Sequence, residues 1–242
     1  MNAENEKRES SALPRSRPSD VHRQDEPHFD PASIWSAISK TPGVGISIMD
    51  SDGGLLFIND TSKVLFFDRD QVDYQGKTIR DFHPPEYVQE RLELIARVLE
   101  SQRPVVIGHI YHGRKIESTV WPLRDSTPPF NRVIVVTHLE SGDSPWRPAA
   151  GCETYKTQFI DLGPLNVLTK RELEVLALLG HGMSVPKAAA ILHRSPKTIE
   201  RHKESIGQKL QMRGQAELVA LVTSMGLDLS DTHLRRFSDR PE

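Results

Sequence analysis

Between residues 194 and 210 the chain reads RSPKTIERHKESIGQKL, a stretch dense in charged side chains. Lys197 and Thr198 follow Ser195-Pro196, and this order is typical of a helix with a serine N-cap and a proline at its first position. The free backbone N–H groups at a helix start carry partial positive charge and bind anions such as phosphate. The chemistry predicted here is therefore anion binding and hydrogen bonding to a polar partner.

The apolar residues of this stretch fall on one side of the predicted helix. Ile199, Ile206 and Leu210, with the aliphatic stem of Lys203, stand at offsets of 0, 4, 7 and 11 residues, so they form a narrow seam for docking. The opposite face is charged. Periodicity alone is equally consistent with a solvated surface helix and with a helix that lies against a charged partner.

Three further helices are predicted around this one. Thr169 and Glu172 form a capping box that begins a helix near residue 170, and the glycines of 180–182 end it. Ser184 is expected to cap a second helix with Pro186 in its first turn, and a fourth helix is expected at about 215–225. Two short helices joined by a tight turn, the second with a polar outer face, are typical of a helix-turn-helix.

The sequence of residues 168–222, LTKRELEVLALLGHGMSVPKAAAILHRSPKTIERHKESIGQKLQMRGQAELVALV, resembles a LuxR-type DNA-binding domain. The resemblance implies a four-helix module whose helix-turn-helix runs from Ser184 to Lys203 and whose partner is double-stranded DNA. It places Lys197 and Thr198 at the DNA backbone and His202 at the position of a histidine common in the family. The positions that would face the bases are Glu200, Arg201 and Glu204.

The chain departs from the family pattern in its charges. Glu200 and Glu204 stand where the family has neutral or basic residues; they repel phosphate but can accept a hydrogen bond from cytosine N4, which predicts an altered sequence preference. Lys187 replaces a capping Glu of the second helix, and Ala188 replaces a larger aliphatic residue, which predicts a looser helix start. The resemblance also implies dimerisation through the fourth helix, for which the candidates are Leu218, Leu221, Val222 and Met225.

Residues 31–140 are predicted to contain both strands and helices, unlike the all-helical C-terminal module. Residues 45–49 and 55–58 are predicted to pair as a β-hairpin through the turn Asp52-Gly53-Gly54, followed by a short helix and a longer one over 86–101 with Leu92, Ile95 and Leu99 on one face. Three more strands are expected at 105–111, 114–122 and 132–138. This order, with GISIMDSDGGLLFIND, EYVQERLELIARVLESQRP and the closing VWPLRD and VIVVTHL, resembles a PAS domain.

The PAS resemblance implies a five-stranded antiparallel sheet that, with its helices, encloses a small-molecule pocket or forms a dimerisation surface. We therefore expect an α+β fold followed by an all-α module. A photoactive flavin requires a cysteine inside the domain, and Cys152 lies beyond it; a haem requires an axial histidine on the long helix, which has none. No cofactor is assigned, and His83, His109 and His112 are expected to be surface or hydrogen-bonded core groups rather than metal ligands.

Charge and composition predict the domain organisation. Residues 29–140 hold 12 basic and 15 acidic side chains (−3), whereas residues 165–229 hold 9 and 6 (+3). We expect a disordered tail over 1–28, a sensor domain over 29–140, a linker over 141–164, the DNA-binding module over 165–228 and a second tail over 229–242. No apolar run reaches the roughly 20 residues of a membrane span, so a cytoplasmic location is expected.

The function expected from these features is that of a dimeric, sequence-specific transcriptional regulator whose PAS domain binds a small molecule or a signalling partner. The alternative is an adaptor that binds only proteins, in which Glu200 and Glu204 exclude phosphate. An enzyme is not expected, because the sequence has no glycine-rich phosphate loop and no paired nucleophile and base.

Overall fold

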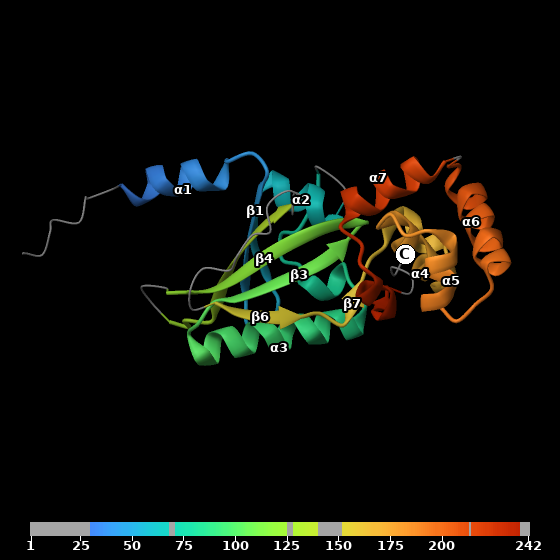
Figure 1. Ribbon diagram of the computed structural model, residues 1–242. Helices are drawn as coiled ribbons and strands as arrows, with labels where there is room; N and C mark the ends of the chain where they lie inside the picture. The colour runs from blue at the N-terminus through green and yellow to red at the C-terminus, as the bar shows by residue number, and fades with distance from the viewer. Residues whose placement is uncertain (1–29, 68–70, 125–127, 140–151, 213, 238–242) are drawn as a thin grey trace, which may run out of the picture.

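The computed structural model describes residues 30–67, 71–124, 128–139, 152–212 and 214–237. The expected tail over 1–28 and most of the expected linker lie outside these residues. Two bodies are visible: a sheet with flanking helices, formed mainly by residues 30–160, and a helical module, residues 170–225, at one end of the sheet (Figure 1). The α+β fold class is confirmed.

The sheet has six strands in the order β2-β1-β5-β4-β3-β6. The five expected strands form and pair antiparallel; their bounds are β1 Val44–Asp50, β2 Leu55–Ile58, β3 Val105–Tyr111, β4 Arg114–Leu123 and β5 Arg132–Leu139. The first and last of these, β1 and β5, are neighbours across seven residue pairs from Val44–His138 to Asp50–Arg132. This closing pair makes the domain one sheet rather than two hairpins.

The sixth strand was not expected. Residues Glu153–Lys156 form β6, which pairs in parallel with β3 from Val105 to Gly108, so part of the predicted linker belongs to the sheet. The strand carries one half-buried side chain, that of Tyr155, and is otherwise exposed. The sequence of this short polar edge strand has no alternating apolar pattern from which a strand could be predicted. The strand is held by backbone pairing with β3 and not by an apolar face packed on the core.

Four helical segments accompany the sheet: α1 Pro31–Ser39, α2 Asp60–Phe67, the 3-10 turn η1 Ile79–Asp81 and α3 Pro85–Ser101. The helix α1 was not predicted. The face predicted for α3 is only partly right: Ile95 is buried, but Leu92 and Leu99 are half-buried, and Leu94 and Val98 lie deeper against β4 and β5. Because α3 also contacts the cluster of Leu55, Ile58 and Ile79 at its first half, its buried side is broader than one seam.

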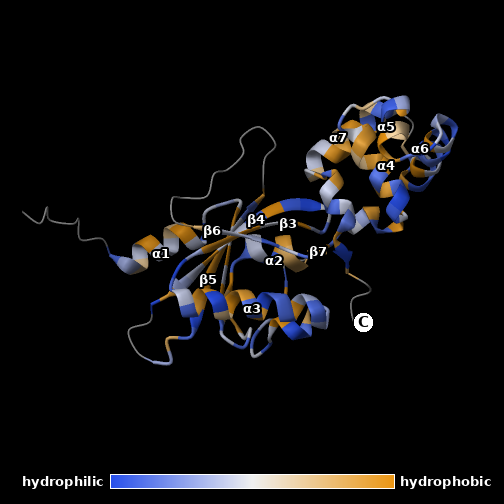
Figure 2. Ribbon diagram, turned by 60° about the horizontal axis from the view of Figure 1, so that its bottom comes forward, coloured by the Kyte–Doolittle hydropathy of each residue, from blue (hydrophilic) through white to orange (hydrophobic). Residues whose placement is uncertain are grey.

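The helical module contains α4 Lys170–Gly180, α5 Val185–Ile191, α6 Pro196–Leu210 and α7 Gln215–Met225, as predicted. The Thr169–Glu172 capping box is present, and residues 175–180 of α4 are all buried, so α4 is the central helix of the module. Hydropathy follows this arrangement: α4 and the strands are predominantly hydrophobic, whereas α6 is largely hydrophilic (Figure 2). Ser184 occupies the N-cap of α5 but its side chain makes no capping hydrogen bond, in contrast to the expectation.

The predicted C-terminal tail is wrong for residues 229–237. The 3-10 turn η3, Leu229–His233, is followed by β8, Arg235–Arg236, which pairs in parallel with β7, Phe159–Ile160. Phe237 then packs edge-on against Tyr87, with 4.8 Å between ring centroids. The segment is too polar to predict an element by itself; its order comes from one aromatic anchor and from backbone pairing with β7, 76 residues earlier (235 − 159), which only the tertiary fold supplies.

Between the two bodies the chain passes through β7 and the 3-10 turn η2, Gly163–Val167. Ile110 of β3 belongs to the same buried cluster as the core of the helical module, together with Ile160 and Leu162. Asp161 donates its backbone N–H to Ile110 and accepts from the N–H of Gly113. The module is therefore docked on the β3–β4 hairpin by both apolar and backbone contacts.

Candidate nucleic-acid interface and ligand cavity

The helix α6 lies at the end of the module farthest from the sheet (Figure 1). It begins as predicted: the Oγ of Ser195 accepts a hydrogen bond from the backbone N–H of Thr198 at 3.2 Å, and Pro196 occupies the first position. Ile199 and Ile206 are fully buried on its inner side, and Leu210 is half-buried. The predicted docking seam is thus confirmed.

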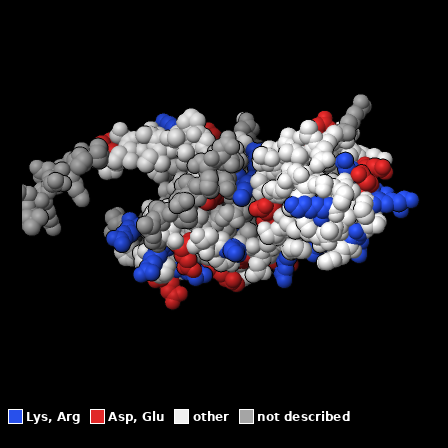
Figure 3. All heavy atoms as spheres, in the orientation of Figure 1, with Lys and Arg blue, Asp and Glu red and all other residues white. Residues whose placement is uncertain are grey.

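The predicted contact residues divide into two groups. Lys197, Glu200, Arg201 and Glu204 are exposed, whereas Thr198 and His202 are half-buried. In the space-filling view, charged side chains project from the outer end of the module over α6 (Figure 3). Within the described part of the chain, Lys197 and Arg201 make no ion pair, so both cations are available to an external partner.

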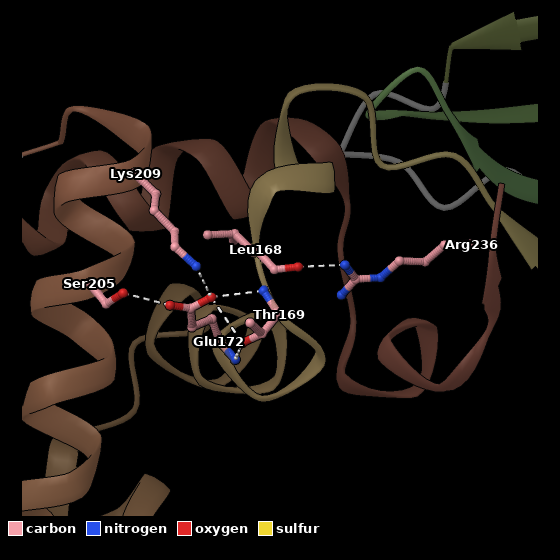
Figure 4. A network of polar contacts seen from close by, with 6 residues as sticks. All are labelled: Leu168, Thr169, Glu172, Ser205, Lys209 and Arg236. Atoms are coloured by element: carbon pink, nitrogen blue, oxygen red, sulfur yellow. Dashed lines mark hydrogen bonds and ion pairs between the residues drawn. The ribbon is translucent and has the colours of Figure 1, made fainter. Parts of the chain in front are cut away.

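A buried carboxylate fixes α6 to the central helix. Glu172 accepts hydrogen bonds from the Lys209 ammonium at 2.7 Å and from the Ser205 hydroxyl at 2.6 Å, both on α6 (Figure 4). It also accepts from the backbone N–H of Thr169 at 2.7 Å, which completes the capping box. Sequence analysis found the capping box but missed Ser205 and Lys209 as its partners, because no local pattern connects positions 33 and 37 residues apart.

The electrostatics of Glu172 follow from these contacts. Burial by itself raises the pKa of the carboxyl, but hydrogen bonds from Lys209, Ser205 and Thr169 outweigh burial and lower the pKa from 4.5 to about 2. The side chain is 6% exposed, and its negative charge is fully paired. The carboxylate thus serves the position of α6 rather than an external ligand.

Most of the apolar residues of α7, the helix predicted to mediate dimerisation, pack inside the chain. Leu218, Val222 and Met225 are buried within the chain and Leu221 is half-buried. The reason is the close approach of α4 and α7: a Cβ atom placed on Gly180 would collide with Val222, so the absence of a side chain at Gly180 lets the two helices meet. The Met225 methyl group reaches the β3–β4 turn, 3.1 Å from the position of a Cβ on Gly113.

The sheet domain encloses a cavity of about 90 Å³ between the sheet, α2 and α3. Its wall is mainly apolar, with Phe66, Ile107, Val120 and Val135 among the lining residues. Six residues with polar groups also line it, namely Ser47, His83, Tyr87, Arg91, His109 and Ser118. Cys152 does not line this cavity.

The polar groups of the cavity have different partners. The Tyr111 hydroxyl lies 3.0 Å from Nδ1 of His83, and the Ser118 hydroxyl lies 3.5 Å from Nε2 of His109. Burial lowers the pKa of His109 well below 6.5, and the positive charge of Arg91 lowers this pKa further, so His109 is neutral at pH 7. The three histidines named from the sequence, His83, His109 and His112, all hydrogen-bond within the fold, His112 to the Phe66 carbonyl.

Arg91, unlike His83 and His109, has hydrogen-bonding atoms that are only partly satisfied. Its Nη2 donates to Oγ1 of Thr157 at 3.3 Å and its guanidinium lies 4.4 Å from the centre of the Tyr87 ring. Nη1 is 3.5 Å from Oε1 of Glu90, an ion-pair distance without a hydrogen bond. Nε and Nη1 are both buried and have no hydrogen-bond partner among the described residues.

Comparison with known families agrees with this architecture. Residues 166–222 match the family described as bacterial regulatory proteins, luxR family, and residues 41–137 match the PAS fold. The chain joins a PAS domain to a regulatory domain of the luxR family. The PAS match covers β1 to β5 with the enclosed cavity, and the LuxR match covers α4 to α6 and most of α7.

Individual proteins match over limited lengths. The oxygen regulatory protein NreC of Staphylococcus carnosus is 45% identical over 56 residues, which are 23% of this chain and 26% of NreC. The protein YjjQ of Escherichia coli O157:H7 is 27% identical over 149 residues, which are 58% of this chain and 60% of YjjQ. The chain thus matches less than two thirds of either relative.

One solved structure matches over most of the chain. The crystal structure of a Vibrio cholerae VqmA–ligand–DNA complex covers 86% of this chain and 93% of that chain, with 21% sequence identity and a TM-score of 0.44. Within the part of the chain described here, no helix is long and apolar enough to cross a membrane. No group of three His, Cys, Asp or Glu side chains among the described residues is placed to hold a metal ion.

Proposed function

We propose that this protein is a sequence-specific DNA-binding transcriptional regulator whose LuxR-type domain is controlled by its PAS domain. The observation that carries the proposal is the outer face of α6, where Lys197 and Arg201 are exposed and have no ion pair with any described residue, on a helix anchored from behind by Glu172. Such a helix has the exposure and the rigid support that entry into a major groove requires.

The six predicted contact residues take two roles in this proposal. Lys197 and the N-terminal turn around Thr198 contact phosphates and set the position of α6 on the duplex. Arg201 reaches base edges, and Glu200 and Glu204 select against the wrong bases, since carboxylates accept from cytosine N4 but repel the backbone. His202 is half-buried and supports the helix at the edge of the interface.

We infer that control acts on the spacing of two DNA-binding modules rather than on access to α6, because α6 is exposed while its module is docked on the PAS domain. A homodimer supplies the second module. Since Leu218, Val222 and Met225 are buried in the chain itself, the apolar residues of α1 are the better candidates for the dimer contact: Ile34, Trp35 and Ile38 are all exposed.

The connection between the domains is the proposed route of control. Glu90 of α3 accepts from the Thr157 hydroxyl at 2.7 Å and from the backbone N–H of Gln158 at 2.8 Å, directly before β7. Arg91, beside it, faces the PAS cavity and also contacts Thr157. A molecule bound in the cavity, or a signalling partner that moves α3, would change the hydrogen bonds that Glu90 and Arg91 make to residues 157–158, and so the position of the segment that leads to the LuxR-type domain. This requires that the molecule or partner binds two arrangements of the two domains with different affinity.

The proposal assigns no enzymatic step, no metal and no resident cofactor to the protein, and it places the protein in the cytoplasm, where its DNA is. The test is binding-site selection with the purified full chain on random duplexes, followed by titration of the enriched duplex at several salt concentrations. We expect a single enriched motif and an affinity that falls steeply with salt through counterion release. An adaptor that binds only proteins would enrich no motif.

A further inference from the structure

The LuxR-type domain is tied to the PAS domain at both of its ends. At its N-terminal end, Asp161 donates its backbone N–H to the Ile110 carbonyl at 3.1 Å, and Gly113 donates to the Asp161 carbonyl at 2.9 Å. At its C-terminal end, the chain returns from α7 through η3 and pairs with β7 (Figure 1). We call residues 235–237, which make this second connection, the C-terminal strap.

The strap reaches both domains with its side chains. The ring of Phe237 packs on the PAS domain, with its centroid 4.8 Å from that of Tyr87 and 5.6 Å from that of Tyr111. Arg236 reaches the other domain and donates to the carbonyl of Leu168, the residue before the capping box of α4 (Figure 4). The strap thus bridges the two domains by an aromatic contact on one side and a hydrogen bond on the other.

The strap also holds the segment that enters the LuxR-type domain. The backbone N–H of Arg235 donates to the Gln158 carbonyl at 2.8 Å, and the N–H of Phe237 donates to the Ile160 carbonyl at 3.2 Å. The backbone N–H of Gln158 donates to Glu90 of α3. Gln158 is therefore bound to α3 through its N–H and to the strap through its carbonyl.

The contacts of the strap are few and partly offset by a cost. Phe237 is half-buried and Arg235 is exposed. Burial lowers the pKa of Arg236, and its Nη2 is buried without a hydrogen-bond partner among the described residues, which disfavours the docked position of this cation. Since short segments with few buried contacts open at a lower free energy than the core, the strap can open while both domains stay folded.

The residues that hold Phe237 belong to the wall of the PAS cavity or contact it. Tyr87 lines the cavity, and so does His83, whose Nδ1 lies 3.0 Å from the Tyr111 hydroxyl. Because the Tyr87 ring contacts Phe237 directly, a displacement of Tyr87 by a molecule in the cavity reaches the strap in one step.

We propose that the C-terminal strap is a releasable contact that holds the LuxR-type domain in its docked position, with Tyr87 as the anchor. The inference rests on the proposed function and deepens it, because release of the strap weakens the docking on the β3–β4 turn and so changes the spacing of two DNA-binding modules. A molecule in the cavity controls the strap to the extent that it binds the held and the released arrangement with different affinity.

The experiment is amide hydrogen exchange of the full chain at pH 7, without DNA, with single amides resolved by mass spectrometry. The reporters are Gly113 and Asp161, whose docking hydrogen bonds do not include the strap. Phe237→Ala should speed exchange at both by about tenfold, since the loss of one half-buried aromatic contact shifts the ratio of held to released chains by about that factor. Amides in the two cores, Leu176 and Val135, should exchange as in the unaltered chain.

A second substitution tests the anchor. Tyr87→Leu should also speed exchange at the reporters, and adding Phe237→Ala to it should change the rates by less than about threefold, because the ring on which Phe237 packs is already gone. Phe130→Ala is the matched control, since Phe130 is a phenylalanine 54% exposed in the connection between β4 and β5. Far-UV circular dichroism establishes that each variant is folded, and Phe237→Ala decides the question if Tyr87→Leu does not fold.

Three results would overturn the proposal: faster exchange in Phe237→Ala that is confined to the strap and leaves Gly113 and Asp161 unchanged, the same acceleration in Phe130→Ala, or fully additive effects in the double variant. Since the assay contains no DNA, these results leave the proposed DNA binding intact. Conversely, a chain whose strap behaves as expected but which selects no DNA motif would contradict the proposed function and not the role of the strap.

Discussion

The LuxR-type domain and the PAS domain treat their charged groups in opposite ways. In the LuxR-type domain the buried charge, Glu172, is satisfied by three partners within the chain. The cations Lys197 and Arg201, which have no ion pair in the part of the chain that the structure describes, stand outside. In the PAS domain the incompletely satisfied cation, Arg91, is inside. The comparison teaches that a buried charge can be held in two ways: Glu172 has a complete set of hydrogen bonds that joins two helices, whereas Arg91 has an ion pair with Glu90 and two donors without a hydrogen bond among the described residues.

The largest effect is expected from the buried carboxylate. The folded-state pKa of Glu172 is about 2, below its ordinary 4.5, so its contribution is present above pH 4.5 and is lost as the pH falls towards 2. The difference corresponds to about 3 kcal/mol of unfolding free energy. Glu172→Gln should therefore lower the stability at pH 7 by about this amount and flatten the profile between pH 4.5 and 2, measured by urea unfolding.

A matched control lies on the same helix. Glu174 pairs with Arg171 at 2.6 Å, the two side chains are 12% and 33% exposed, and among the described residues no hydrogen bond or ion pair joins either of them to α6. Glu174→Gln should cost less than about 1 kcal/mol, as surface pairs do. If both variants lost the same unfolding free energy, the contacts of Glu172 with α6 would contribute nothing beyond an ordinary ion pair. The contrast between Glu172 and Arg91 would then fail.

The next effect concerns DNA affinity. Arg201→Ala should weaken binding to the selected duplex by about 1–3 kcal/mol and relax the preference at one base position, because a base-contacting arginine discriminates among bases. Competition between selected and scrambled duplexes measures this. A variant that loses affinity for both duplexes equally would assign Arg201 to the backbone instead.

Lys197→Ala should have a smaller effect of a different kind. A phosphate contact contributes to affinity whatever the sequence, so the variant should weaken binding uniformly and reduce the slope of log affinity against log salt by about 1. Fluorescence anisotropy over a range of salt concentrations gives the slope. An unchanged slope would remove Lys197 from the interface.

The smallest change in stability is expected at the buried cation. Arg91→Met loses the stacking on Tyr87, one hydrogen bond to Thr157 and the 3.5 Å ion pair with Glu90, although Glu90 keeps its hydrogen bonds from Thr157 and Gln158. The change also removes two unsatisfied donors, and these terms oppose each other. We expect the unfolding free energy to change by less than about 1 kcal/mol without ligand. A loss as large as that in Glu172→Gln would mean that Arg91 supports the fold, which would erase the contrast between the two domains.

The sequence by itself determined the local elements and the two families. The Ser195-Pro196 start, the Thr169–Glu172 capping box and the seam of Ile199 and Ile206 are short-range signals, because caps and helical periodicity depend on residues a few positions apart. They were sufficient to predict α4 and α6 and the outward face of α6. The domain boundaries and the DNA contacts remain predictions.

Only the tertiary structure decided which groups meet across long separations. It buried Leu218, Val222 and Met225 of α7 inside the chain, turned the polar segment 229–237 into a strand partner of β7, and placed Ser205 and Lys209 on Glu172. It also left the buried Nε and Nη1 of Arg91 without a hydrogen-bond partner among the described residues. Burial and long-range pairing depend on the surface that distant segments present to each other, and no local pattern in one chain encodes that surface.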